Sequence, residues 1–134
     1  MSEIIGLDNL ERKLTALAKA LSKDEFLESA KDGMTIYVEG PAKRNAPVGK
    51  SRPGYTGGRL RGSITSTIDE DKAITGTNVE YGPRVELGFN DTDSLGRKYN
   101  QAPKPYLRPA WDEGKSKVVE HMEEQAVKNI RSIL

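Results

Sequence analysis

The chain has 134 residues, 35% of them hydrophobic and 31% charged, with a formal net charge of +1, a size that suits one domain over residues 1–134. It contains no cysteine, which excludes disulfides and thiolate metal sites. No apolar run approaches the roughly 20 residues of a membrane helix and the N-terminus lacks a signal-peptide pattern, so we expect a cytoplasmic product with no membrane partner.

The small net charge conceals one segment without acids. All the charged residues among positions 40–68 are basic, and they are spread over a predicted loop rather than along one helical face. Three interpretations stay open for this segment: an exposed loop, a contact with an acidic protein surface, or a contact with DNA phosphates. Its basic residues are Lys43, Arg44, Lys50, Arg52, Arg59 and Arg61.

Two helices are predicted in the first third of the chain. The first begins at Asp8, which stands at capping-box spacing from Glu11, and its apolar residues recur every three or four positions. Ser22 and Glu25 form a second capping box, and we expect the second helix to be kinked at Gly40-Pro41 and to end before Pro47. The expected inward residues are Leu10, Leu14, Leu17, Ala18 and Leu21, followed by Phe26, Ala30, Met34, Tyr37 and Val38.

The middle of the chain predicts a loop and a small sheet. Residues 48–58 are rich in Gly, Pro and basic residues and form the first long loop. Residues 60–68 alternate between apolar or small and polar side chains, which predicts a strand that pairs through a polar turn with residues 73–79. Residues 81–88 fit either a short helical turn or an edge strand, because Pro83 argues against a central strand.

The last third predicts a second loop and a long helix. Residues 89–104 are polar and turn-rich, and the helix is expected to begin at Pro109. Trp111 lies on the apolar stripe of this helix, so we expect it in the core rather than in a binding site. The complete pattern predicts an α+β fold with two N-terminal helices, a small antiparallel sheet, a long C-terminal amphipathic helix and two long flexible loops.

Groups capable of catalysis are sparse. His121 is the only histidine, and the acids beside it are expected on a solvent-facing helical surface, which disfavours a triad or a zinc site. Residues 90–94 offer oxygen ligands but lack the glycine and the distal glutamate of a calcium loop, and residues 54–62 lack the ending of a phosphate-binding loop. We therefore predict no enzyme, with no catalytic residue, no cofactor and no metal site.

Glu86 stands just before Leu87 and Gly88, at the start of the second predicted loop. It is either a surface glutamate followed by a turn glycine, or an acid that pins the loop by pairing with an arginine. The candidate arginines are Arg59, Arg61 and Arg108.

Three motifs follow one another along the chain. After Ala46-Pro47-Val48 come residues 56–64 (TGGRLRGSI), 81–88 (YGPRVELG) and 102–110 (APKPYLRPA). Together they resemble the tail-completion, or head-to-tail joining, proteins of long non-contractile-tailed bacteriophages over roughly residues 8–130. That family has an Ala-Pro-Val-x-Thr-Gly-x-Leu-x-x-Ser-Ile block, a Tyr-Ala-x-x-Val-Glu-x-Gly block and a Pro-Phe-Leu-x-Pro-Ala block. The matching structural residues are Thr56, Gly57, Leu60, Ser63, Ile64, Glu86, Gly88, Pro105 and Pro109.

The chain departs from this pattern at three places. Residues 49–55 lengthen the first loop, which puts its geometry in doubt. Gly82 replaces the usual Ala, and Tyr106 replaces the common Phe.

The resemblance implies a structural virion protein of the tail or neck, made in the cytoplasm of the host bacterium. It would be a monomer when free and a homo-oligomeric ring, expected to be a hexamer, at the head-proximal end of the tail. The ring would contact a head-closure or connector protein on one side and a tail tube or tail terminator protein on the other. We expect residues 48–60 and 89–104 to make these contacts, with Lys50, Arg52, Tyr55, Arg59, Arg97, Lys98 and Tyr99 taking part.

Other functions compete with this one. The protein could be a tail terminator or another neck component, or a DNA-binding module that uses residues 40–68. A ring whose lumen makes non-specific contact with passing DNA is a compatible secondary role.

Overall fold

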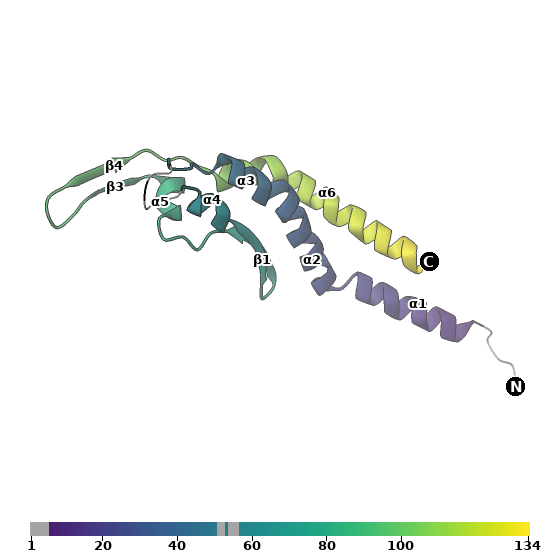
Figure 1. Ribbon diagram of the computed structural model, residues 1–134. Helices are drawn as coiled ribbons and strands as arrows, with labels where there is room; N and C mark the ends of the chain where they lie inside the picture. Colours follow the sequence, from purple (N-terminus) through teal and green to yellow (C-terminus); the bar gives the residue numbers. More distant parts are fainter. Residues whose placement is uncertain (1–5, 51–52, 54–56) are drawn as a thin grey trace, which may run out of the picture.

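The computed structural model describes residues 6–50, 53 and 57–134, and its fold is α+β. Figure 1 shows long helices side by side, a β-hairpin extending from one end and the first helix extending from the other. The elements in chain order are α1 (Leu7–Ala20), α2 (Lys23–Met34), the π-helical turn η1 (Thr35–Glu39), α3 (Gly40–Asn45), α4 (Arg59–Ser63), β1 (Thr65–Asp69), β2 (Lys72–Gly76), α5 (Gly82–Leu87), β3 (Phe89–Thr92), β4 (Lys98–Gln101) and α6 (Leu107–Ile133).

Of the two predicted capping boxes, the first does not form, and the second forms only its N-cap bond because the N–H of Ser22 donates to the carbonyl of Lys19. Helix α1 begins at Leu7 after Gly6, whose φ is 92°, and Asp8 lies inside the first turn without capping it by its side chain. In α2 the backbone N–H of Glu25 donates to Ser22 Oγ at 3.3 Å, as the sequence predicted. Asp8 still complements the positive end of α1, because acidic side chains in a first turn interact favourably with the helix dipole.

Proline 41 is accommodated within one continuous helix. The segments α2, η1 and α3 follow without a break from Lys23 to Asn45, which confirms that the helix ends before Pro47. Since Pro41 has no N–H, the carbonyl of Tyr37 lacks its usual donor four residues later. The π-helical turn Thr35–Glu39, in which hydrogen bonds join residues five apart, lies immediately before the segment that contains Pro41.

Helix α6 packs unusually closely against this helix, because glycines stand at both crossing points. A Cβ on Gly114 would overlap the carbonyl oxygen of Tyr37, and a Cβ on Gly33 would lie 3.3 Å from the Cα of Val118. The core is built around this contact. Its buried residues are Met34, Val38, Ala42, Ala46, Leu60, Ile64, Val79, Val85, Tyr106, Ala110 and Val118.

The first predicted strand was too long. Residues 59–63 form the short helix α4 instead, and the strand covers only Thr65–Asp69. Gly58, with φ 101°, starts α4, and its carbonyl accepts from the N–H of Gly62 at 2.9 Å. Leu60 and Ile64 are both buried, and a spacing of four residues fits a helical turn as well as a strand, so the alternation misled the prediction.

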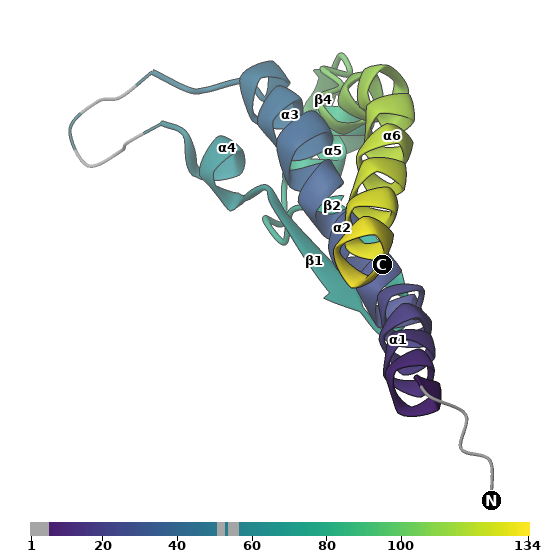
Figure 2. The same ribbon diagram turned by 90° about the vertical axis from the view of Figure 1, so that its right-hand side faces the viewer.

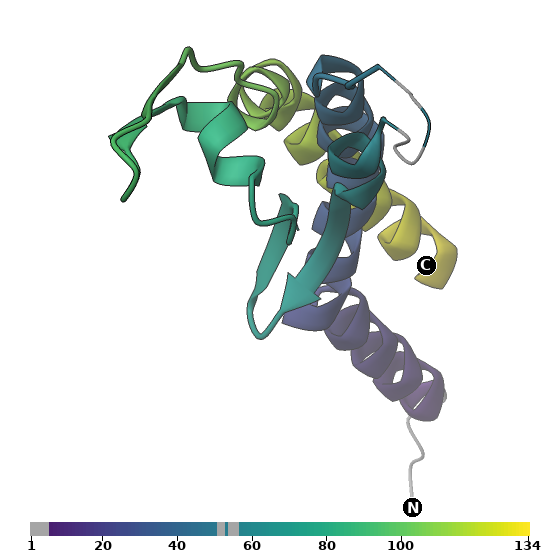
Figure 3. The same cartoon turned by 60° about the vertical axis from the view of Figure 1, so that its left-hand side comes forward.

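The predicted antiparallel hairpin is confirmed, but its second strand ends at Gly76 rather than at residue 79. Strands β1 and β2 pair antiparallel, with Ile68 opposite Ala73, and the turn contains Glu70 at φ 54°. The hairpin lies beside α2 (Figure 3). Residues 82–87, which fitted either a helical turn or an edge strand, form the helix α5.

The second long loop was a wrong prediction, because residues 89–101 contain a second antiparallel hairpin of strands β3 and β4. Its turn is built on Asp93, whose Oδ1 accepts from the N–H groups of Leu95 and Arg97, each at 2.9 Å. Gly96 supplies the left-handed residue, with φ 79°. The sequence suggested a loop because the strands are polar and nearly all their residues are exposed.

Helix α6 is the predicted C-terminal helix, but it begins at Leu107. Pro109 is therefore the third helical residue, still inside the first turn, where backbone N–H groups have no partner in the helix. Two side chains differ from expectation. Trp111 is 44% exposed rather than in the core, and His121 faces the ring of Tyr37 edge-on at 6.4 Å rather than solvent. None of the described helices is long and apolar enough to cross a membrane.

The contact between Gly114 and Tyr37 can be tested by Gly114→Ala. We expect a loss of about 1–3 kcal/mol in the free energy of unfolding, because the added methyl group forces the two helices apart. Urea denaturation followed by circular dichroism measures it. The matched control is Gly62→Ala in α4, where a Cβ meets no atom within 4 Å, so stability is expected to stay equal or rise. Equal stability of the G114A and wild-type proteins would contradict the proposed constraint.

Candidate functional site

The three motifs, which are far apart in sequence, come together in space. Leu60, Gly82, Glu86 and Tyr106 lie around one point between α4, α5 and the start of α6, and we call this set the motif junction. A Cβ on Gly82 would lie 3.0 Å from Tyr106 Oη and 3.6 Å from Leu60 Cδ1. Tyr106 is only 1% exposed, so the junction belongs to the core.

Glu86 fastens α5 to the N-terminus of α6. Its Oε2 accepts from the N–H of Tyr106 at 2.7 Å and of Leu107 at 3.0 Å, and its Oε1 accepts from the N–H of Arg108 at 3.0 Å. These donors are among those that a helix leaves unpaired in its first turn, where a negative charge also interacts favourably with the helix dipole. Glu86 thus ties α5 to the start of α6 through backbone amides. It is therefore not simply a surface glutamate, and the groups that it binds are backbone N–H groups rather than an arginine side chain.

Gly82 and Tyr106 form the second link in the junction. The Tyr106 hydroxyl donates to the carbonyl of Gly82 at 3.0 Å, and burial, followed by the charge of Glu86, raises the pKa of Tyr106. A Cβ on Gly82 would also lie 2.7 Å from Thr77 Cγ2. The two positions at which this chain departs from the resembled pattern therefore touch each other: the space that an alanine methyl group would need lies against the tyrosine hydroxyl.

Gly88 closes the base of the β3–β4 hairpin. With φ 79° it adopts a left-handed conformation, and a Cβ there would lie 2.9 Å from the carbonyl oxygen of Gln101 and 3.0 Å from Pro103. Nearby, the N–H of Lys104 donates to the carbonyl of Val85 at 2.7 Å. Pro105 is exposed and leads from this base into α6. The hairpin is thus anchored at both ends next to the motif junction.

The first motif supports the junction from the other side. Ile64 is fully buried, and the hydroxyl of Ser63 bonds to that of Thr77, which also accepts from the N–H of Val79 at 3.1 Å. Thr77 was not singled out from the sequence, where a threonine in a polar stretch gives no signal. A Cβ on Gly57 would overlap the carbonyl oxygen of Gly49, so the two ends of the first loop touch there. Thr56 lies outside the described residues.

The residues expected to contact partners are placed on the two polar segments. Lys50 and Lys98 are exposed, whereas Arg52 and Tyr55 fall outside the described residues. Arg59 already has a partner within the chain, because its two terminal nitrogens contact both carboxylate oxygens of Glu80 at 3.1 Å each. Within the described part of the chain Lys50 and Lys98 have no ion-pair partner, whereas Arg59 is paired with Glu80 on the surface.

The tip of the β3–β4 hairpin is held by Asp93. Arg97 Nε donates to its Oδ2 at 2.6 Å, and the Tyr99 hydroxyl donates to the same oxygen at 3.2 Å. Burial raises the pKa of Asp93, but the hydrogen bonds from Arg97, Leu95 and Tyr99 outweigh it and hold the pKa below its ordinary value. The Tyr99 ring lies 6.2 Å from that of Phe89, which in turn lies 4.1 Å beneath the guanidinium of Arg84. Arg97 and Tyr99 thus shape the hairpin tip.

Within the described ranges, no three His, Cys, Asp or Glu side chains are grouped to hold a metal ion. Comparison with models of protein families, with curated proteins and with solved structures finds no match for this chain. What the motifs build is an anchoring point for two polar segments.

The role of Glu86 is tested by Glu86→Gln. One carboxamide oxygen cannot accept from all three amides and carries no charge, so we expect a loss of about 1–2 kcal/mol in the free energy of unfolding. The control is Glu80→Gln, which removes an exposed ion pair with Arg59 and is expected to change stability little. Chemical denaturation of both variants measures the difference, and equal effects would refute the assigned role of Glu86.

The Gly82–Tyr106 contact is tested by a double-mutant cycle. Gly82→Ala is expected to destabilise the wild-type protein by about 1–3 kcal/mol through overpacking. In a Tyr106→Phe background the same change should cost less, because the hydroxyl oxygen that crowds the methyl group is absent, although Thr77 still does. Thermal and urea unfolding of the four proteins gives the coupling free energy, and strict additivity would show that the two positions are independent.

Proposed function

We propose that this protein is a structural component of a bacteriophage tail or neck, assembled in the host cytoplasm, that joins the tail to the head-closure or connector complex. The observation that carries the proposal is that the three motifs of the resemblance, separated in sequence, form one buried junction held by Glu86 and Tyr106. Motifs that serve joining rather than chemistry are expected to fix a scaffold, and the bonds of Glu86 and Tyr106 are consistent with that role.

The junction presents two polar segments to other molecules. The first lies between α3 and α4; its described residues 46–50 lead away from α3, and residues 57–58 lead into α4 (Figure 2). The second is the β3–β4 hairpin, which extends from the end of the molecule opposite α1 (Figure 1). A two-stranded hairpin with exposed residues on both strands has unpaired backbone donors and acceptors at its edges, which another chain can use. Both segments are therefore suited to docking on neighbouring proteins.

The partners we propose are further copies of the chain in a ring, with a hexamer as the expected number, a head-closure or connector protein, and a tail tube or tail terminator protein. A tail terminator or another neck component would use the same scaffold. Locating the protein relative to the portal by electron microscopy of particles separates these assignments.

DNA binding is the second candidate function, and the pairing of its basic residues weighs against it. In residues 40–68, Lys43 lies 3.7 Å from Glu39 and Arg59 is paired with Glu80, while Arg61 donates to the carbonyl of Ala46 at 3.2 Å. Cations already paired within the chain contribute less to phosphate binding. Retention on duplex DNA at about 50 mM salt, weakening steeply as salt rises, would favour this function.

The joining function is tested by removing the projecting hairpin. Residues 91–99 are replaced by Asn-Gly, a pair that closes a two-residue hairpin turn between Asn90 and Asn100. We expect a folded monomer, with heads and tails that remain separate in an in-vitro complementation assay. Deletion of residues 50–55 is expected to give the same result.

Lys117→Glu, an exposed change on α6 far from the hairpin in sequence, serves as the control and should join heads and tails normally. Joining at the wild-type level by both the shortened-hairpin and the shortened-loop proteins would refute the proposal.

A further inference from the structure

The N-terminal helix carries an apolar face that the described fold leaves half uncovered. Leucines at positions 7, 10, 14, 17 and 21 recur every three or four residues, yet no residue of α1 is buried. Leu10 and Leu14, in the middle of this leucine stripe, are 53% and 55% exposed. Figure 1 shows α1 continuing beyond α2, away from both hairpins. An apolar row of this kind marks an interaction surface.

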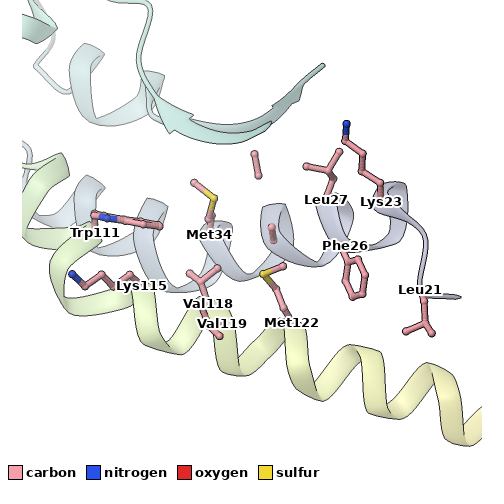
Figure 4. A pocket seen from close by; sticks show the side chains of 12 residues that line it. Leu21, Lys23, Phe26, Leu27, Met34, Trp111, Lys115, Val118, Val119 and Met122 are labelled. Atoms are coloured by element: carbon pink, nitrogen blue, oxygen red, sulfur yellow. The ribbon is translucent and has the colours of Figure 1, made fainter. Parts of the chain in front are cut away.

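A second apolar surface lies between α2 and α6. It is a groove of about 610 Å³ (Figure 4), and its charged lining residues are two lysines, Lys23 and Lys115. Large apolar side chains on its walls remain partly open to solvent: Phe26 is 38%, Trp111 44% and Val119 53% exposed. Met34, Val118 and Met122 also line the groove, as the view in Figure 4 shows. Trp111, which the sequence placed in the core, thus forms part of an accessible wall.

From these two surfaces we infer that α1 of one copy of the chain occupies the α2–α6 groove of a second copy. Leu7, Leu10 and Leu14 stand at i, i+3 and i+7, the spacing with which an amphipathic helix places anchors into a hydrophobic groove. Charge also matches. Glu11 borders the leucine stripe and Lys115 borders the groove, and neither has an ion-pair partner among the residues that the structure describes.

The short link between α1 and α2 explains why the occupant is another copy rather than the chain's own helix. Only Leu21 and Ser22 separate the two helices, and both are used as caps. Their N–H groups donate to the carbonyls of Leu17 and Lys19, and Ser22 Oγ accepts from Glu25 N. Reversing the chain to lay α1 along its own α2 would break the bonds from Leu21 and Ser22 to the end of α1, and in this structure α1 contacts its own α6 instead. Leu21 also lines the groove, so stripe and groove meet there and form one continuous apolar surface.

Repeated between successive copies, this contact adds chains without limit unless the copies close into a ring. The stripe and the groove are different surfaces, so the contact is heterologous, and repetition gives a ring or an open chain. A helix of 14 residues is about 21 Å long and covers less than the roughly 800 Å² per partner of a standard interface. A single contact is therefore weak, in keeping with a monomer at low concentration. The inference deepens the proposed ring and rests on that proposal only for the number of copies.

Engineered cysteines test the contact directly, because the chain has no cysteine of its own. Leu14→Cys and Val119→Cys proteins are mixed at high concentration and oxidised, and we expect a disulfide-linked pair of chains. Two controls place the thiol on the opposite face of the same helix: Arg12→Cys with V119C, and L14C with Lys117→Cys. Both should give several-fold less product. Circular dichroism confirms that each variant is folded.

Two outcomes would overturn the inference. One is equal cross-linking by the controls, or none by any pair. The other is a disulfide within a single chain carrying both L14C and V119C at high dilution, which would place α1 in its own groove. Either result leaves the joining function intact, since the complementation assay reads that separately; failure of joining with normal cross-linking would instead reject the function and keep the contact.

Charge substitutions give an independent test of the head-to-tail arrangement. Leu14→Glu removes the stripe and Val119→Glu blocks the groove, and both positions are exposed, so both variants should fold. Each alone should stay monomeric in sedimentation velocity at concentrations where the wild-type protein associates. An equimolar mixture should form a two-chain complex and nothing larger, because one stripe and one groove remain. Association of either variant alone at the wild-type level would refute the heterologous contact.

Discussion

The close approach of α6 to the backbone of Tyr37 is the constraint on which the rest of the fold depends. Pro41 removes the donor that the Tyr37 carbonyl would have in an α-helix, and the π-helical turn lies immediately before the segment that contains this proline. Gly114 then lets α6 lie directly against that carbonyl, while Gly33 of α2 lets the backbone of Val118 in α6 come close. The small residue Ala110, fully buried, continues the contact toward the motif junction. The continuous helix from α2 to α3 and helix α6 therefore lie close together because the glycines at their contact have no side chains, and we call this pair the spine.

The far end of this spine is fixed by Glu86. Its three bonds to the first amides of α6 tie α5 to the spine, and the Tyr106 hydroxyl ties α6 back to Gly82. Because α5 also opens into the β3–β4 hairpin at Gly88, a single acid positions both a helix terminus and the base of a projecting arm. This arrangement supports the proposed joining function, since a docking arm transmits force only if its base is rigid.

Apolar surface is distributed unevenly along the molecule. The core between the spine and β1–β2 is well buried, whereas the leucine stripe of α1 and the wall at Trp111 are about half exposed. A ring in which each stripe meets the next groove would cover both, so the proposed assembly would complete the burial that the isolated chain leaves open.

The sequence by itself determined the elements whose signals are local. The Ser22 cap, the long helix after Pro109 and the turn between β1 and β2 all follow from residue types within a few positions of one another. Only the tertiary structure decided where residues 59–63, Trp111 and Glu86 belong. Leu60 and Ile64 fit a helix and a strand equally, so packing chose the helix. Glu86 finds its amides twenty residues away, and Trp111 stands on the wall of a groove formed with α2, far from it in sequence. Such choices depend on contacts between distant segments, which periodicity along the chain does not encode.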